Sequence, residues 1–171
     1  MYGLKKVGQN RYRETAGGYY EEFNIGDVFE HRPGRTISEA DNTWFTLLTM
    51  NTHPIHFDHV YAAKSDFGQH LVNSALTLAI VTGMSVTTTS QKSIANLGWT
   101  DITLPSPVYA GDTIYAETEV INKRESKSRK DNGIITVNTR GLKDDGTIVL
   151  TMKRSFMVAK TGKAVDDRAG Y

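Results

Sequence analysis

The sequence predicts an α+β domain in which an antiparallel sheet curls around one buried helix. Residues 69–84 are apolar on most sides of a helix, which is the pattern of a helix buried in a core. Along residues 113–121, the small or β-branched side chains at the even-numbered positions 114–120 alternate with tyrosine and glutamate at positions 115–119. Residues 133–140 and 147–159 are rich in β-branched side chains, as strands are. One buried helix followed by a run of long strands is typical of the α+β class.

The composition excludes several classes of protein. The chain has 171 residues and no cysteine, so it is long enough for one real core and has no disulfide, catalytic thiolate or zinc–thiolate site. Its net charge of +1 gives no general attraction to nucleic acid or to an anionic membrane. The N-terminus has no apolar run of the kind that directs secretion, and the longest apolar run, residues 71–81, is interrupted by polar residues. We therefore expect a cytoplasmic protein with no nucleic-acid or membrane partner.

Three segments are expected along the chain. Residues 1–20 are polar and contain glycine, and we predict that they form a loosely attached N-terminal arm. Residues 21–160 are predicted to form a single domain, and residues 161–171 a C-terminal tail. The first strand of the domain is expected over residues 28–32, ended by the turn signal Pro33-Gly34.

A helix is expected after this strand. Ser38 followed by Asp41 resembles a capping box, and the helix that begins there should end near Asn51 because Pro54 disfavours its continuation. A second, short helix is expected over residues 60–64. The side chains expected on the buried face of the first helix are Trp44, Phe45, Leu47, Leu48 and Met50.

The connections between the later strands carry turn signals. Asn132-Gly133 and residues 144–146 are expected to be the two turns of this region. The basic run over residues 123–130 has the composition of a solvated hairpin end, and binding of the phosphates of a ligand is the alternative.

Histidines are concentrated in one short stretch. Three of the five in the chain, His53, His56 and His59, lie between Asn51 and the second helix. The ordinary pKa of histidine is close to neutrality, so such a group suits proton transfer. The regular spacing of three would also suit a metal on one face of a helix, but Pro54 interrupts a helix here, and we predict no metal site. We expect His59 to be a surface residue.

This stretch resembles the motif of MaoC-like, (R)-specific enoyl-CoA hydratases. The family motif is an aspartate and a histidine separated by four residues, written D-x-N-P-x-H, and Asn51-Thr52-His53-Pro54-Ile55-His56 matches it except at its first position. Phe67-Gly68 with residues 71–74 resembles the start of the central helix of the family, and residues 105–114 resemble its P-V-x-x-G-D-T-L element. The resemblance covers residues 20–160 and is nearest to the mesaconyl-CoA or itaconyl-CoA hydratase subgroup.

The resemblance implies a fold, an activity and a state of association. The fold is a single hot-dog fold, an antiparallel sheet wrapped around one long central helix. The activity is that of a hydratase or dehydratase, which adds water reversibly to the double bond of an enoyl-CoA thioester with a short branched or dicarboxylic acyl group. Coenzyme A is then part of the substrate and no cofactor is implied. The association implied is a homodimer or a dimer of dimers.

The resemblance also implies roles for particular residues. His56 is the implied acid and base, Asn51 the residue that positions the water, and the backbone N–H of Ser74 the donor to the enolate oxygen. Two departures from the family pattern affect this site, because an amide at Asn51 cannot accept a proton as a carboxylate does, and Asn73-Ser74 replaces the usual histidine-glycine pair. The residues implied in substrate binding are Asn73, His53 and Asp58.

Two other functions stay open on the sequence alone. A hot-dog thioesterase usually has an acid on or near its central helix, and residues 71–84 contain none. A non-catalytic acyl-CoA-binding or accessory subunit would explain the loss of the carboxylate at Asn51. Asn73 and Ser74 are also common helix caps, a role that is compatible with a place in the site.

Overall fold

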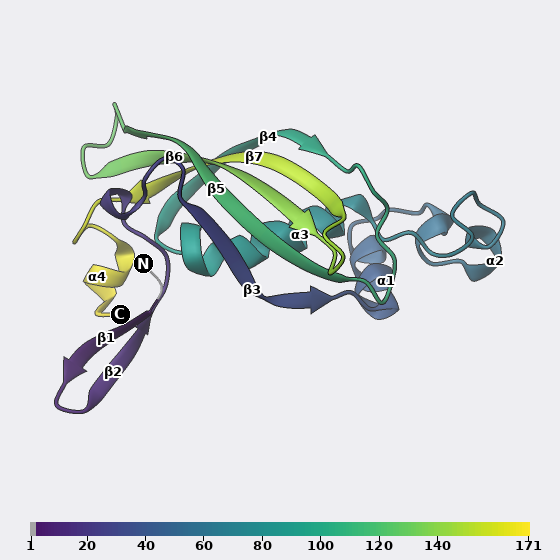
Figure 1. Cartoon of the computed structure of the whole chain (residues 1–171), viewed down its shortest axis with the longest axis horizontal. Coiled ribbons are helices and arrows are strands. Elements are labelled where there is room, and N and C mark those ends of the chain that lie inside the picture. The colour runs from purple at the N-terminus through teal and green to yellow at the C-terminus, as the bar shows by residue number, and fades with distance from the viewer. Residues whose placement is uncertain (1–2) are drawn as a thin grey trace.

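The structure is a computed structural model that describes residues 3–171, and it has the predicted α+β arrangement. A five-stranded antiparallel sheet, in the order β3-β5-β6-β7-β4, curls around helix α3 (Figure 1). The strands of this sheet are β3 (Val28–Thr36), β4 (Ser93–Thr103), β5 (Thr113–Glu125), β6 (Asn132–Leu142) and β7 (Ile148–Ala159). The helices around it are α1 (Glu39–Leu48), α2 (His59–Ala62), α3 (Ser74–Ser85) and α4 (Val165–Ala169), with short helical turns η1 (Tyr20–Glu22), η2 (Pro54–His56) and η3 (Val86–Ser90).

The core lies between α3 and the concave face of the sheet. Leu76 and Val81 of α3 pack with Ile114 of β5 and Leu150 and Met152 of β7. A second cluster lies toward the other end of the sheet and contains Phe23, Val120, Ile135, Val137, Phe156 and Val158. The helix is less buried than its composition predicts, because Ala75, Ala79 and Gly83 lie exposed on one side of it. Residues 3–171 therefore leave one side of the central helix uncovered.

The three predicted C-terminal strands are present as β5, β6 and β7, and residues 144–146 form the turn between the last two. The prediction of a turn at Asn132-Gly133 is wrong, since both residues belong to β6 and the loop precedes them. Gly133 is needed there for close packing: a Cβ atom at this position would lie 2.0 Å from the ring of Tyr20. Strand β4 was not predicted, because its side chains follow no clear alternation.

Strand β3 continues past the turn signal that was expected to end it. It pairs with β5 from Val28 to Thr36, with a register shift between His31 and Arg35. Pro33 lies within that shift and on an edge strand, where its missing N–H breaks no ladder hydrogen bond. The predicted end at Pro33-Gly34 is therefore wrong, and the irregular pairing is the reason.

Helix α1 begins at its predicted cap but buries a different face. Ser38 Oγ accepts from Asp41 N–H at 3.1 Å, and Asp41 Oδ2 accepts from Ser38 N–H at 2.8 Å, so the capping box is confirmed. The predicted apolar face is wrong, since Phe45 alone of its five residues is partly buried and the other four are exposed: Trp44, Leu47, Leu48 and Met50. The residues of α1 that are buried are polar, Asn42 at 1% and Thr46 at 0% exposure.

The predicted N-terminal arm contains a hairpin of β1 (Gly3–Gly8) and β2 (Arg11–Thr15), which lies near α4 (Figure 1). Tyr19 Oη donates to Asp167 Oδ1 at 2.6 Å, and a guanidinium nitrogen of Arg13 donates to the carbonyl oxygen of Gly170. Residues 1 and 2 of the predicted arm lie outside the described part of the chain. Over residues 3–171, none of the helices has both the length and the apolar character that a bilayer crossing requires.

Candidate functional site

His56 is held at the end of the short turn η2, which begins beside α1. Its side chain is buried, with 8% exposure, and its Nδ1 lies 2.7 Å from the carbonyl oxygen of Leu71. A carbonyl oxygen can only accept, so Nδ1 must carry the proton. Nε2 makes no hydrogen bond within residues 3–171 and is not sealed from solvent. The ring is therefore fixed in the tautomer that leaves Nε2 as an acceptor, which is what a general base requires.

The start of α3 provides the second element of the site. Asn73 is its N-cap, and the side-chain oxygen of Asn73 accepts from Ala75 N–H at 2.9 Å. The backbone N–H of Ser74 donates no hydrogen bond within the described residues. An unpaired N–H at the positive end of a helix dipole can stabilise a developing oxyanion.

A cavity of about 210 Å³ opens beside this helix start. Ser74 lines it together with Leu71, the residue whose carbonyl oxygen holds the His56 ring, whereas His56 itself is not a lining residue. The other lining residues are uncharged: Phe67, Val72, Thr77, Leu104, Pro105, Ser106, Pro107 and Val108. The cavity suits an acyl chain or another largely apolar group.

The other residues predicted for the site have local structural roles in this chain. Asn51 Oδ1 accepts from His53 N–H at 3.0 Å, and Asp58 Oδ1 caps α2 by accepting from Val60 N–H at 2.9 Å. The ring of His53 contacts that of His56, with centroids 5.9 Å apart. In residues 3–171 no hydrogen bond joins Asn51 or Asp58 to His56. Their predicted roles toward water and substrate stay predictions.

Asn42 and Thr46 are the residues that the sequence reasoning missed. Asn42 Nδ2 donates to the carbonyl oxygens of His56 and Leu71, at 2.9 and 3.1 Å, and Asn42 Oδ1 accepts from Asn73 N–H at 2.8 Å. Thr46 Oγ1 accepts from Asn73 Nδ2 at 3.2 Å. The available signal was that Asn42 and Thr46 lie four residues apart, since residues with this spacing share one face of a helix.

The group of three within residues 3–171 that could hold a metal ion is not His53, His56 and His59, whose spacing was considered in the sequence. It is a different group that contains only one of them. Glu39, His59 and His70 place ligand atoms within 4.8 Å of one another, and His70 Nε2 is buried with no hydrogen-bond partner among residues 3–171. However, the rings of His59 and His70 are stacked, with centroids 4.1 Å apart and planes 24° from parallel. An imidazole nitrogen binds a metal in the plane of its ring, so two stacked rings do not aim at one ion. This group is therefore not a preformed tetrahedral site.

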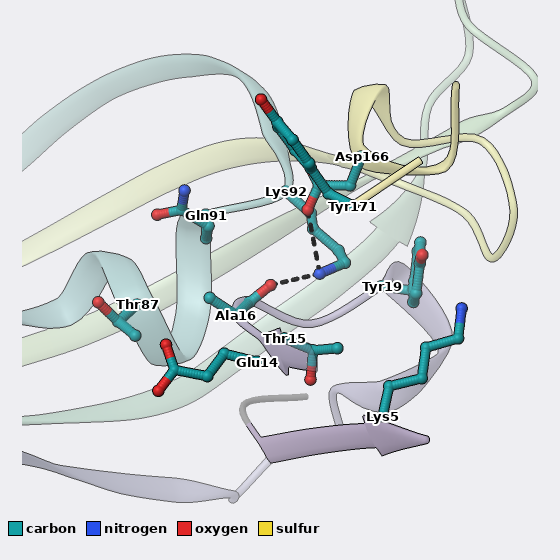
Figure 2. Close-up of a pocket in the computed structure, with 10 residues that line it drawn as sticks. All are labelled: Lys5, Glu14, Thr15, Ala16, Tyr19, Thr87, Gln91, Lys92, Asp166 and Tyr171. Atoms are coloured by element: carbon teal, nitrogen blue, oxygen red, sulfur yellow. Dashed lines mark hydrogen bonds and ion pairs between the residues drawn. The ribbon is translucent and has the colours of Figure 1, made fainter. Parts of the chain in front are cut away.

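A larger cavity, of about 590 Å³, lies between the N-terminal hairpin and the C-terminal residues (Figure 2). Lys92 lines it with 8% exposure; its Nζ donates to the carbonyl oxygen of Ala16 and lies 3.3 Å from Asp166 Oδ2. Burial and the hydrogen bond to Asp167 raise the pKa of the neighbouring Tyr19 to about 12. The buried ammonium group of Lys92 is thus paired by segments from both ends of the chain. None of the residues predicted for the site lines this cavity, so it is not the candidate site.

Comparison with known proteins shows a family model and several relatives that this chain resembles. The model of the MaoC like domain matches residues 22–141. A mesaconyl-CoA hydratase of Cereibacter sphaeroides is 30% identical over 152 residues, which are 89% of this chain and 44% of the relative. A β-methylmalyl-CoA dehydratase of Chloroflexus aurantiacus is 31% identical over 148 residues, which are 86% of this chain and 42% of the relative. The chain thus spans less than half the length of these two relatives.

A solved structure shows the same fold. A conserved hypothetical protein of Mycobacterium tuberculosis, described as having a double hot-dog fold, superposes on 85% of this chain with a TM-score of 0.77. It is 22% identical to this chain, which covers 45% of its length. The predicted hot-dog fold is therefore confirmed.

Proposed function

Because this chain belongs to the family of MaoC-like domains, we propose that it is the hot-dog unit of an enoyl-CoA hydratase. The reaction is the reversible addition of water to the double bond of an enoyl thioester. The proposed acyl group is short and branched or dicarboxylic, a class supported by relatives named for mesaconyl-CoA and β-methylmalyl-CoA. The observation that carries the proposal is that Leu71, three residues before Ser74, holds the His56 ring at Nδ1, while His56 Nε2 and Ser74 N–H both make no hydrogen bond within residues 3–171.

In the proposed mechanism these two groups act first in the addition of water to the β-carbon and then in the protonation of the α-carbon. His56 Nε2 removes a proton from a water molecule while the water oxygen forms a bond to the β-carbon. The electron pair of the double bond moves toward the thioester carbonyl, and the resulting enolate oxygen accepts a hydrogen bond from Ser74 N–H. The imidazolium then returns the proton to the α-carbon. The substrate is neither oxidised nor reduced, so the reaction calls for no flavin or nicotinamide.

Asn51 stands where the family motif has an aspartate, and we propose that its amide orients the water by hydrogen bonding. An amide can hold a water molecule but cannot take its proton, so the whole proton transfer falls to His56. General acid–base catalysis contributes roughly 10²–10⁴-fold, and a single well-placed histidine can supply it.

We further propose that the working unit contains two hot-dog domains, supplied by two copies of this chain. Strand β4 is at the edge of the sheet and carries exposed apolar side chains, among them Leu97, Trp99 and Ile102. The exposed strip of α3 formed by Ala75, Ala79 and Gly83 lies uncovered as well. An unpaired edge strand favours pairing with another strand. A double hot-dog fold in a related structure of about twice this length supports the same arrangement.

The proposal is tested by following the enoyl-thioester absorbance of crotonyl-, mesaconyl- and itaconyl-CoA with the purified protein. The expected result is loss of the conjugated double bond without release of free thiol, with a preference for one of the two branched substrates. Release of free thiol at the same rate would instead identify a thioesterase. If none of the three thioesters is turned over but the protein still binds them, the non-catalytic acyl-CoA-binding function is correct.

A further inference from the structure

Asn42 joins the candidate base to the candidate oxyanion donor. Its side chain reaches three separate places: the backbone of His56, the carbonyl oxygen of Leu71 that holds the His56 ring, and the N–H of Asn73 at the cap of α3. We propose that Asn42 is a positioning residue that fixes the tautomer of His56 and its placement relative to Ser74 N–H. Its effect on turnover rests on the proposed function, whereas its effect on the His56 ring does not.

The orientation of the Asn42 amide is determined by its partners. Both hydrogens of Nδ2 are used, one on each carbonyl oxygen, and Oδ1 faces an N–H that can only donate. The flipped amide would place oxygen against two carbonyl oxygens and NH₂ against an N–H. Only the observed orientation satisfies all three contacts, and at 1% exposure water cannot replace them.

The carbonyl oxygen of Leu71 is where the two sets of contacts meet. It accepts from His56 Nδ1 at 2.7 Å and from Asn42 Nδ2 at 3.1 Å, so both of its lone pairs are used. Because both donors bond the same oxygen, Asn42 Nδ2 and the His56 ring nitrogen lie within about 6 Å of each other. The direction of that carbonyl group, and hence of the His56 ring, depends on Asn42.

This role explains why α1 buries a polar face. A buried amide without partners is destabilising, so Asn42 is stable there only with its partners in place. The buried face of α1 thus carries polar side chains that align the site, and Trp44 and Leu48 of the same helix are exposed.

The substitution that tests the role is Asn42→Asp, which keeps the size of the side chain and its acceptor toward Asn73 but removes both donated hydrogen bonds. A carboxylate would repel the two carbonyl oxygens and attract a proton onto His56. We expect kcat to fall on the order of 10²-fold with a smaller change in KM, because the base is misplaced by a fraction of an ångström or more. We also expect the acidic limb of the kcat/KM profile to move to higher pH, because a carboxylate within about 6 Å favours the imidazolium.

The matched control is Asn132→Asp. Asn132 is also a buried asparagine whose Nδ2 donates to a main-chain carbonyl oxygen, that of Val158 at 3.5 Å, but it begins β6 at the other end of the sheet (Figure 1). This control should keep turnover within about twofold and leave the pH profile unmoved, because no shared partner couples it to the site. His53, the titratable side chain in ring contact with His56, is the same in all these proteins.

Long-range ¹H–¹⁵N correlation spectra at pH 8 show which ring nitrogen of His56 carries the proton. The His56 signals are assigned by their loss in His56→Gln. The wild type should show His56 protonated at Nδ1, and Asn42→Asp should show a mixture of tautomers or a charged ring. If Asn42→Asp does not fold, Asn42→Ser, which can donate to only one carbonyl oxygen, replaces it in both measurements.

The outcomes separate this inference from the proposed function. A His56 ring protonated at Nε2 in the wild type, or the same ring signals in the wild type and both Asn42 variants, would overturn the positioning role even if the protein is a hydratase. A wild type without hydratase turnover whose His56 tautomer still changes on substitution of Asn42 would contradict the proposed function and leave the positioning role intact.

Discussion

Acid should destabilise this protein through a buried histidine outside the candidate site. His31 of β3 is 2% exposed, and its two ring nitrogens lie 2.7 Å from Thr118 Oγ1 and from Thr88 Oγ1. Burial lowers the pKa of His31 from 6.5 to about 4, and the positive charges of Arg154 and Arg32 act in the same direction. The folded protein therefore keeps this ring neutral at a pH where the unfolded chain would bind a proton.

The size and sign of the effect follow from linkage. Between pH 6.5 and about 4 the unfolded state binds more protons at this site than the folded state, so the free energy of unfolding falls as the pH falls through this window. The pKa difference corresponds to a loss of roughly 3 kcal/mol, complete slightly below pH 4. Carboxylates such as Asp41, whose pKa is lowered by hydrogen bonds from Ser38, add a further loss on acidification.

The assay is urea unfolding at pH 7, 5.5 and 4 for the wild type and for His31→Gln. The variant should be less stable at pH 7, but its stability should fall less steeply with acid, because it has no imidazole to protonate. The carboxylates are common to both proteins and cancel in the difference. Equal slopes for the two proteins between pH 7 and 4 would refute the reasoning.

Three further predictions concern the helix start, the sheet edge and a cap. Ser74→Pro removes the proposed oxyanion donor at a first helical position that tolerates proline, after a residue with ψ of 127°, so the fold should persist while kcat/KM falls about 10²–10³-fold. Ser74→Ala keeps the N–H and should retain most of the turnover, and equal losses in both variants would contradict the backbone role. Trp99→Glu on the edge strand β4 should convert the proposed dimer to a monomer in light scattering after size exclusion, and an unchanged mass would show that this edge is not the interface. Ser38→Ala should lower the free energy of unfolding by about 1 kcal/mol in urea titrations, because α1 loses its side-chain cap, and no change would mean that the cap is not stabilising.

Much of the fold could be predicted because its signals are local. The capping pair at Ser38 and Asp41 and the alternation along β5 specify their elements without reference to the rest of the chain. The end of β3 could not be predicted in this way, because Pro33 is tolerated only through the edge position of the strand and the shifted pairing with β5. Gly133 was misread as a turn residue for a similar reason, since its need for space comes from Tyr20, more than a hundred residues away.

The candidate site shows the same division. The motif around His56 could be recognised, but the partner of its ring is the carbonyl oxygen of Leu71, and a backbone group leaves no mark in the sequence. Asn42 was hidden for a related reason: apolarity predicted that Trp44 and Leu48 face the core, whereas the hydrogen bonds of Asn42 turn the polar face inward. A buried polar network outweighed the apolar pattern of a short helix.

Steady-state turnover of mesaconyl-CoA by His56→Gln tests whether His56 is the base of the proposed hydration reaction. The matched control is His59→Gln, which alters an exposed histidine three residues further on, at the start of α2. We predict a loss of about 10²–10⁴-fold in kcat for His56→Gln, with the fold intact and with little change for His59→Gln. Turnover that survives in His56→Gln at the wild-type rate would contradict this prediction.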